Sequence, residues 1–237
     1  MALWPRGKRC KHCLQNEHSR FFAGLKSIMN AVYETPQGPG RGPKDRERRE
    51  QDRELLIATA RRLIHEKGLR NLSGREITQT AGFSPGFTNR LFGGLDGLIV
   101  AANLPTLRAL KAHLAQADQP RASVEGRLLA LTDAYIMFAE QEGQLWCALF
   151  EHQVEAAPDV VAHEMSSLFA LLERVLADAG VAEEECPLMA KAFWSGVHGI
   201  VYLGRTGGLG PVGPDSVRAM VHLLVRTLAR GLAARPS

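Results

Sequence analysis

Residues 82–86, GFSPG, fit the pattern G-x-S-x-G, in which a sharp turn presents a nucleophilic serine in hydrolases. Such a serine needs a buried strand before it, a helix after it, and a histidine and a carboxylate that activate its hydroxyl. The residues before Ser84 carry the start signals of a capped helix and not those of a strand. The sequence therefore predicts no catalytic residue at this position, and no enzyme.

Cys10 and Cys13 form a C-x-x-C pair with His12 and His18 close by, which raises the question of a zinc site. A structural zinc ion takes four ligands, usually from two spaced pairs. No second pair follows in this region, and the alternative is a tail that happens to carry thiols. We therefore predict no metal ion.

A second pattern, GLGPVG at residues 208–213, fits the dinucleotide-binding motif G-x-G-x-x-G. That motif must follow a strand and open a helix, with an acidic residue further on. Here it follows a predicted helix and contains a proline, so the sequence predicts a loop and no cofactor.

The 237-residue chain has the composition of a globular protein, with 45% hydrophobic residues. No apolar run approaches the roughly 18 residues that a membrane helix requires, and the N-terminus lacks the apolar segment of a signal peptide. Four scattered cysteines agree with a reducing compartment. We therefore expect a cytoplasmic protein that does not enter a membrane.

Charge is distributed unevenly along the chain. Residues 1–100 hold 18 Lys and Arg against 10 Asp and Glu, whereas residues 101–237 hold 11 against 15. A basic part joined to a mildly acidic remainder suggests that the first part meets a polyanion.

The basic part begins with residues 1–45, which show no sustained periodicity and end in a Pro- and Gly-rich stretch. They are predicted to be disordered or loosely ordered. Apolar residues then recur at helical spacing over 46–67, and Gly68 follows where a helix end needs a left-handed residue.

Two short helices come next. Ser73 and Glu76 have the spacing of a capping box, which predicts a helix that starts after Ser73. Ser84 and Pro85 are a further start signal, because serine is a preferred N-cap and proline is favoured at the first helical position. We expect this helix to begin at Pro85, with the Ser84 hydroxyl as its cap, and to end before Gly93.

From residue 96 onward every periodic segment is helical. One helix is expected from Asp96 through Leu110, with a kink at Pro105. Further helices are expected over 128–139, 145–150, 160–179, 187–203 and 216–233. No segment of four to eight residues alternates as a strand would, so the sequence predicts an all-α fold.

The helices expected over 74–81 and 85–92 are joined by only three residues. Two short helices with a glycine in such a turn are the helix-turn-helix arrangement, whose second helix lies in the major groove of DNA. Gly82 is expected to have the positive φ of the turn, and Phe83 to pack inward. The N-terminus of the second helix also suits a phosphate group.

Residues 57–99, IATARRLIHEKGLRNLSGREITQTAGFSPGFTNRLFGGLDGLI, resemble the N-terminal DNA-binding domain of the TetR family of transcriptional regulators. The residues that match the family pattern are Gly68, Ser73, Ile77, Ala81, Gly82, Ser84, Gly86, Phe92, Gly93, Asp96 and Leu98. The chain departs from the pattern at Asn89 (usually Tyr), Leu91 (His or Tyr) and Leu95 (Lys). In the family that Tyr and Lys commonly contact phosphates, so the resemblance implies that two positioning contacts are missing.

Residues 194–199, WSGVHG, resemble a TetR subgroup whose C-terminal domain carries the signature W-x-x-x-H-G. The resemblance implies that this domain binds a small molecule among its helices and that its last two helices form a four-helix bundle in a dimer. We therefore expect a three-helix DNA-binding domain over 46–95 and an effector-binding and dimerisation domain over 96–237.

Candidate DNA contacts come from the helix-turn-helix. Four residues are expected to be exposed on the recognition helix and to read base edges, namely Phe87, Thr88, Asn89 and Arg90. The candidates for phosphate contact are Ser73, Arg75, Ser84 and Asn89. Packing inside the domain is the alternative for Phe87, and helix capping is the alternative for the two serines.

The candidate effector contacts are Tyr135, Phe138, Trp146, Phe150, Phe169, Trp194 and His198. Aromatic residues at helical spacing are also ordinary core, and for His198 a hydrogen-bonded core histidine is favoured over a ligand contact. A mostly apolar lining would favour a hydrophobic or aromatic effector.

The sequence thus predicts a ligand-responsive repressor that binds a pseudo-palindromic operator in double-stranded DNA as a homodimer. The alternative is a helical small-molecule-binding dimer with weak or lost DNA affinity, which Asn89 and Leu95 would favour. A strongly salt-dependent affinity for duplex DNA separates the two hypotheses.

Overall fold

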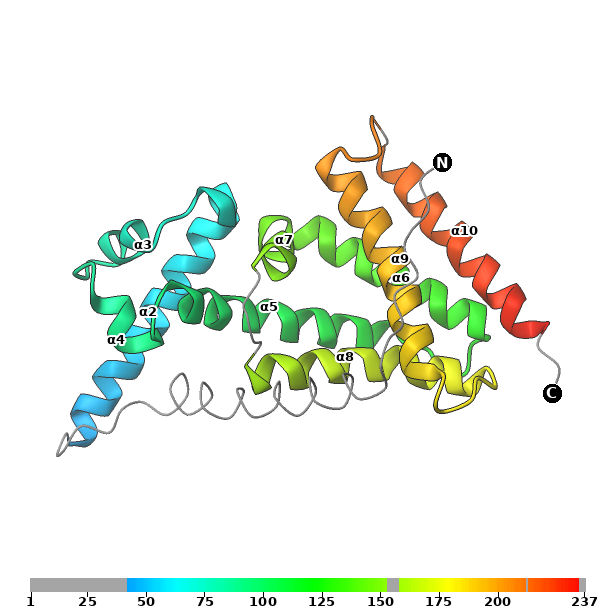
Figure 1. Cartoon of the computed structure of the whole chain (residues 1–237), viewed down its shortest axis with the longest axis horizontal. Coiled ribbons are helices and arrows are strands. Elements are labelled where there is room, and N and C mark those ends of the chain that lie inside the picture. Colours follow the sequence, from blue (N-terminus) through cyan, green and yellow to red (C-terminus); the bar gives the residue numbers. More distant parts are fainter. Residues whose placement is uncertain (1–41, 153–157, 212, 235–237) are drawn as a thin grey trace, which may run out of the picture.

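The computed structural model describes residues 42–152, 158–211 and 213–234, and every regular element within these ranges is helical. The predicted all-α fold is confirmed for them (Figure 1). The α-helices are α2 (Pro43–Lys67), α3 (Gly74–Thr80), α4 (Phe87–Phe92), α5 (Leu95–Ala117), α6 (Val124–Glu142), α7 (Gln144–Glu151), α8 (Asp159–Asp178), α9 (Cys186–Thr206) and α10 (Pro214–Ala233), and a short 3-10 helix, η1 (Leu69–Asn71), follows α2. The predicted N-terminal extension, apart from its last few residues, and the Cys10 and Cys13 pair lie outside the described residues.

Helix α2 begins at Pro43, three residues earlier than predicted, because proline suits the first turn of a helix. Its first turns are exposed, and a buried stripe starts at Leu56 and continues to Ile64. The helix ends at Gly68, which has a φ of 78° and a ψ of 159°. The positive φ is confirmed, although the residue is not in the left-handed helical region. A Cβ atom at Gly68 would lie 2.9 Å from Gln144 Oε1, the end of a flexible side chain, so the positive φ is the main reason that this position favours glycine.

Helices α2, α3 and α4 lie together at one end of the molecule and pack around the first turns of α5 (Figure 1). Their core is one cluster of buried side chains, which comprises Leu56, Ala60, Leu63, Ile64, Ile77, Leu91, Phe92, Leu98, Ile99, Ala102, Leu145 and Ala148. We call it the N-terminal core. Its last two members come from α7, so the short helix α7 is part of this core despite its distance along the chain.

Helices α5, α6, α8, α9 and α10 form a second, larger core with the other side of α7. Helices α9 and α10 approach closely because two glycines lie between them. A Cβ atom would lie 2.5 Å from Val217 Cγ2 if it stood at Gly204, and 2.9 Å from Leu224 Cδ2 if it stood at Gly196. A larger residue at Gly204 would clash with the branched Val217 side chain, whereas at Gly196 the end of the Leu224 side chain could shift.

A buried ion cluster joins the far ends of α5, α6 and α8. Arg127 of α6 is only 4% exposed, and its Nε and NH1 atoms lie 2.9 and 2.5 Å from carboxylate oxygens of Asp118 and Asp178. A buried charge is tolerated only when it is paired in this way. The hydrogen bond from Arg127 holds the pKa of Asp118 below its usual value.

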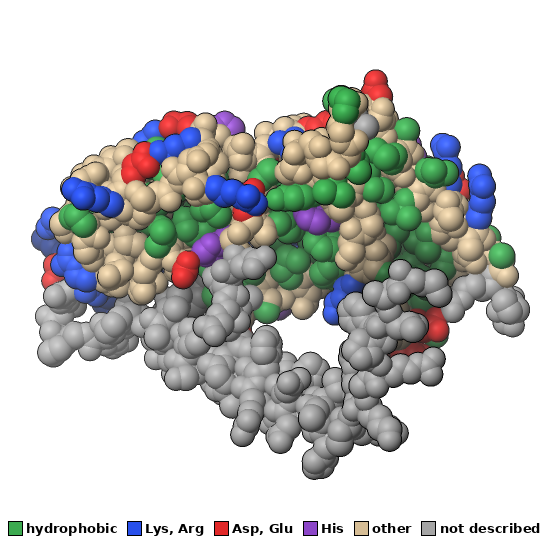
Figure 2. Space-filling model, turned by 45° about the horizontal axis from the view of Figure 1, so that its top comes forward, with side chains coloured by type: hydrophobic (Ala, Val, Ile, Leu, Met, Phe, Trp, Pro, Cys, Tyr) green, Lys and Arg blue, Asp and Glu red, His purple; other side chains and the backbone are tan. Residues whose placement is uncertain are grey.

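The surface differs between the two ends. Figure 2 shows several Lys and Arg side chains at the end formed by α2–α4, whereas hydrophobic side chains gather over the C-terminal helices. Large exposed apolar residues on α9 and α10 are Leu188, Leu203 and Leu223, which are 76%, 42% and 67% exposed. None of the described helices is long and apolar enough to span a membrane.

Candidate DNA-binding surface and effector cavity

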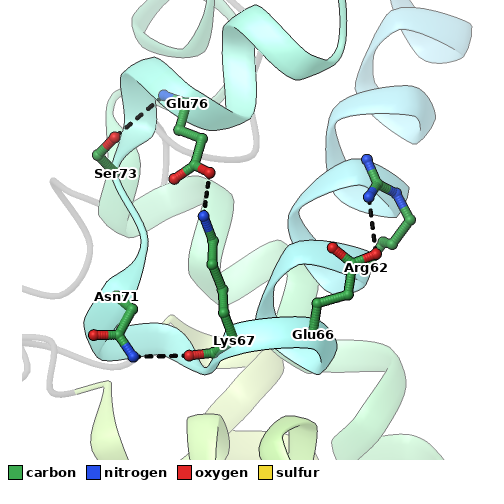
Figure 3. Close-up of polar contacts among 6 residues, drawn as sticks. All are labelled: Arg62, Glu66, Lys67, Asn71, Ser73 and Glu76. Carbon is green, nitrogen blue, oxygen red and sulfur yellow. Dashed lines mark hydrogen bonds and ion pairs between the residues drawn. The ribbon is translucent and has the colours of Figure 1, made fainter.

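Helix α3 begins in a polar cluster that joins it to α2 (Figure 3). Ser73 Oγ accepts a hydrogen bond from the Glu76 N–H at 3.2 Å, which confirms the predicted N-cap. The Glu76 carboxylate pairs with the Lys67 ammonium of α2 and so does not complete the predicted capping box. Asn71 Nδ2 also donates to the Lys67 carbonyl at 2.9 Å. These bonds fix the start of α3 against the end of α2.

The turn between α3 and α4 rests on Gly82, whose φ of 80° confirms the predicted positive value. The next residue, Phe83, donates its N–H to the Thr78 carbonyl at 2.8 Å and packs its ring against the N-terminal core. The predicted inward packing of Phe83 is therefore confirmed.

Helix α4 begins at Phe87, two residues later than predicted, and its N-cap is Gly86. The prediction that the Ser84 hydroxyl caps this helix is wrong. The first turn is closed instead by the Ser84 main-chain carbonyl, which accepts the Phe87 N–H at 3.0 Å. Because a main-chain bond holds the turn, the exposed Ser84 side chain has no structural duty in it.

Arg53 of α2 anchors the other end of α4. Its NH1 donates to the Leu91 carbonyl at 2.7 Å, and its guanidinium lies 4.5 Å from the centre of the Phe92 ring. The Leu91 and Phe92 side chains are buried in the N-terminal core. The recognition helix is thus held by the Arg53 guanidinium of α2, by two of its own apolar side chains in the N-terminal core, and by packing against α5.

The outer face of α4 presents Asn89 and Arg90, which are both exposed. Phe87 is half-buried, and its ring stacks on Phe83 at 4.2 Å with an angle of 2° between the rings. The Arg90 guanidinium lies over the Phe87 ring, 4.7 Å from its centre. The prediction that Thr88 is exposed is wrong, because it is only 4% exposed and packs inside the domain. Thr88 therefore does not face a base edge in this conformation.

Between α5, α7, α8 and α9 lies a cavity of about 460 Å³. Its lining comprises Val100, Asn103, Leu104, Leu107, Leu110, Leu149, Phe150, His152, Pro158, Val161, Met165, Leu168 and Trp194. Sites for small molecules commonly have volumes of roughly 300 to 1,000 Å³ and apolar walls with a few polar groups. We call this space the effector cavity. A smaller void of about 50 Å³ lies behind Leu168 and Trp194, which line both spaces.

The seven aromatic candidates fall into three places. Phe150 and Trp194 line the effector cavity, and Tyr135, Phe169 and Trp194 line the smaller void. Phe138, Trp146 and His198 line neither space. Trp146 is 0% exposed and Phe138 is 4% exposed, so both are packed core.

His198 is a hydrogen-bonded core histidine, which was the alternative interpretation of this residue. Its Nδ1 lies 2.7 Å from the Tyr135 hydroxyl, and the Trp194 ring stacks on it at 4.8 Å. Burial lowers the pKa of His198 and raises the pKa of Tyr135, so both groups stay neutral. A hydrogen bond between two neutral groups thus joins the Tyr135 hydroxyl to the His198 imidazole.

Helix α7 touches both cores. Leu145 and Ala148 lie in the N-terminal core, whereas Trp146 and Phe150 lie in the aromatic cluster around His198. Residues one position apart on a helix face different sides, which is how a helix of eight residues can serve two cores.

Comparison with known proteins connects this geometry to a family. Residues 128–228 match the family described as tetracyclin repressor-like, C-terminal domain. The HTH-type transcriptional regulator BetI of Brucella canis is 30% identical over 104 residues, which are 42% of this chain and 52% of the relative. The chain thus spans about half the length of the curated relatives it matches.

Solved structures extend the likeness to the whole fold. A TetR-family transcriptional regulator from Streptomyces coelicolor has a TM-score of 0.56 and 19% identity, and covers 79% of this chain and 90% of its own. A protein of Pseudomonas aeruginosa PAO1 whose proposed role is transcriptional regulation has a TM-score of 0.58 and 25% identity, with 77% and 92% covered. A Rhodococcus protein of unknown function has a TM-score of 0.60 and 23% identity, with 83% and 99% covered.

These matches support a relationship between this chain and the TetR family. TetR-family regulators are DNA-binding proteins without enzymatic activity, which agrees with the prediction that this chain is not an enzyme. In the described part of the TetR-like chain, no group of three or more His, Cys, Asp or Glu could hold a metal ion.

Sequence reasoning missed two polar residues that line this cavity, Asn103 and His152. Asn103 interrupts the apolar stripe of α5, and that interruption was the signal that could have identified it. His152 gives no such signal, because it follows the last residue of α7 and meets the cavity only through the packing of four helices.

Proposed function

We propose that this chain is a cytoplasmic, ligand-responsive repressor that binds a pseudo-palindromic operator as a homodimer. The observation that carries the proposal is the recognition helix α4, which presents Asn89 and Arg90 to solvent while Arg53 and the Phe83 turn hold it in place. A rigid helix with an exposed amide and an exposed guanidinium suits base edges in the major groove, where Arg pairs with guanine and Asn with adenine.

Phosphate contacts are assigned to exposed groups around α4. Ser73, Arg75 and Ser84 are exposed at the start of α3 and in the turn, and Asn89 completes the set. The exposed first turns of α2 add arginines, among them Arg46 and Arg48. Such contacts fix the position on DNA without reading its sequence.

The homodimer is assigned to α9 and α10. The exposed Leu188 and Leu223 lie on these helices, and a shallow apolar groove runs along them past Met189, Leu224 and Leu228. An exposed apolar surface of this kind favours association with a second copy. Two copies joined here would present two recognition helices to successive half-sites.

Ligand response is assigned to the effector cavity through α7. Phe150 lines the cavity, and Ala148 on the same helix is packed in the N-terminal core. The dimer would have two conformations, which differ in the position of α7 and in the spacing of the two recognition helices. A ligand that binds one conformation more tightly would shift the population toward it, by an amount set by the difference in affinity. The mostly apolar lining favours a hydrophobic or aromatic effector. The stacking of Trp194 on His198 one helical turn later also supports assignment to the W-x-x-x-H-G subgroup.

The test is a gel shift with DNA that flanks the gene of this protein, at low and at moderate salt. Arg90→Ala is expected to weaken binding by about 5- to 150-fold, which corresponds to roughly 1 to 3 kcal/mol for one base contact. Arg121→Ala is the matched control, because Arg121 is exposed in the loop between α5 and α6. Equal loss in both variants would remove Arg90 from readout, and no binding by the wild type at low salt would reject the DNA-binding function in favour of a ligand-binding dimer.

A further inference from the structure

Among the residues that the structure describes, the lining of the effector cavity carries no Lys, Arg, Asp or Glu, and most of it is aliphatic or aromatic. An ionised ligand would lose its hydration there without meeting an opposite charge, which costs several kcal/mol or more. The lining alone therefore selects against carboxylates, phosphates and ammonium groups.

The polar groups of the cavity gather at the C-terminus of α7. Asn103 Nδ2 donates to the Ala148 carbonyl at 2.9 Å, and the His152 main-chain N–H reaches the same carbonyl at 3.4 Å. The Asn103 side chain of α5 and the His152 main chain, directly after α7, thus share one carbonyl. The opposite part of the cavity is walled by apolar groups such as Leu110 and Leu168.

Both side chains at this polar end carry a buried atom without a hydrogen-bond partner among the described residues. These atoms are Asn103 Oδ1 and His152 Nε2. His152 Nε2 lies 3.7 Å from Asp96 Oδ1, which is too far for a hydrogen bond. A buried polar atom left without a partner costs about 1 to 3 kcal/mol, and such atoms are rare in folded proteins.

We propose that the effector is an uncharged, mostly apolar molecule that carries a hydroxyl group, as an alcohol or phenol does. The hydroxyl donates to Asn103 Oδ1 and accepts from the His152 ring, while the apolar body lies between Leu107, Leu168 and Trp194. A single hydroxyl suits the site because it both donates and accepts. The inference rests on the proposed function in one respect, the role of this cavity as the effector site.

The hydroxyl position also explains how binding reaches the DNA-binding end. Asn103 holds the carbonyl of Ala148, and Ala148 is 0% exposed in the N-terminal core. A ligand that engages Asn103 therefore acts one hydrogen bond away from the packing of α2 and α5.

The test compares three probes of one shape, namely 2-naphthol, naphthalene and 2-naphthoate, by equilibrium dialysis against the full chain without DNA. We expect 2-naphthol to bind about 5- to 10-fold more tightly than naphthalene, as one net hydrogen bond provides. We expect 2-naphthoate to bind more weakly than both. Equal binding of 2-naphthol and naphthalene, tightest binding of 2-naphthoate, or no binding of any probe would each overturn the proposal.

Two variants locate the hydroxyl. Asn103→Leu is expected to abolish the preference for 2-naphthol over naphthalene while naphthalene still binds. Asn71→Leu is the matched control, because Asn71 makes the same kind of side-chain bond to a main-chain carbonyl at 2.9 Å but lies outside the cavity. If Asn103→Leu fails to fold, His152→Phe decides in its place. A preference retained in the folded variant overturns the assignment.

The outcome is independent of DNA binding. A chain that prefers 2-naphthol but binds no duplex would reject the proposed function and keep this inference. A chain that binds its operator but shows no preference among the probes would reject this inference and keep the proposed DNA-binding function.

Discussion

The two ends of this molecule are held together by different kinds of contact. At the DNA-binding end, several contacts join close neighbours in sequence, as between Ser73 and Glu76 or Phe83 and Phe87, beside the longer-range bond from Arg53 to the Leu91 carbonyl. At the effector end, rings from separate helices meet, as Tyr135 of α6, Trp146 of α7 and His198 of α9 do. The first kind of contact fixes a rigid shape with few residues, whereas the second leaves room for a cavity among large side chains.

The contrast between the two ends predicts the largest loss of stability when one buried aromatic ring of the effector end, that of Trp146, is removed. Trp146→Ala is expected to lower the free energy of unfolding by about 3 to 5 kcal/mol, because Trp146 is fully buried and its loss leaves a cavity. Phe169→Ala is the matched control and should cost less, since Phe169 is only partly buried. Urea denaturation followed by circular dichroism measures both. A Trp146→Ala protein of wild-type stability with reduced effector binding would restore Trp146 as a ligand contact.

A methyl group added between α4 and α5, within the DNA-binding end, should have the next largest effect. A Cβ atom at Gly97 would lie 2.0 Å from the Phe92 carbonyl oxygen, so Gly97→Ala forces α4 and α5 apart at a cost of about 1 to 3 kcal/mol. This outweighs the helix propensity that alanine normally adds.

The control for Gly97→Ala is Gly86→Ala. Gly86 has open space around it and a φ of −82°, so the substitution should change stability by only a few tenths of a kcal/mol. The same variant tests the DNA-binding surface, because a methyl group there would hinder close approach of the α4 N-terminus to DNA. Full DNA affinity in Gly86→Ala would reject that close approach, and a stable Gly97→Ala would reject the clash.

The ion cluster of α5 and α6 is a polar exception within the effector end, and acid should reveal it. Because the Arg127 hydrogen bond holds the pKa of Asp118 below its unfolded value of about 3.9, the stabilisation is complete above that pH and is lost as the pH falls through the folded-state value. Asp118→Asn should therefore be less stable than wild type at neutral pH, and the difference should shrink in acid. Thermal melts from about pH 7 to about pH 3 measure it. A difference that stays constant over this range contradicts the linkage.

The smallest effect separates the two serines of the DNA-binding end. Ser73→Ala should cost about 1 kcal/mol, because it removes an N-cap, whereas Ser84→Ala should leave stability nearly unchanged. Thermal melts of both variants give the comparison. Equal losses would mean that Ser84 caps α4 in solution after all.

The same contrast explains what the sequence could predict. The cap at Ser73 and the turn at Gly82 are decided by residues within one helical turn, so their patterns are visible in the chain itself. The prediction that the Ser84 hydroxyl caps α4 was wrong because a main-chain hydrogen bond closes that turn and needs no hydroxyl. The prediction for Thr88 was wrong because its burial depends on how α4 packs against helices distant along the chain, chiefly α5.

The effector cavity was less predictable for the same reason. An aromatic residue at helical spacing has the same pattern whether it fills a core, as Trp146 does, or lines a cavity, as Phe150 does. The Asn103 side chain and the His152 main-chain N–H share the Ala148 carbonyl, and nothing in either local sequence specifies this shared acceptor. Long-range packing decides these positions, and a single sequence does not encode it in a pattern that can be recognised by spacing.

The membership of Leu145 and Ala148 in the N-terminal core has a consequence for chimeric regulators. A graft that exchanges DNA specificity by joining a foreign domain at residue 95 would leave the transplanted core without the apolar side chains of α7 and of the first turns of α5. The exchangeable unit is therefore discontinuous in sequence, and a working hybrid needs the inward face of α7 matched to the incoming α2.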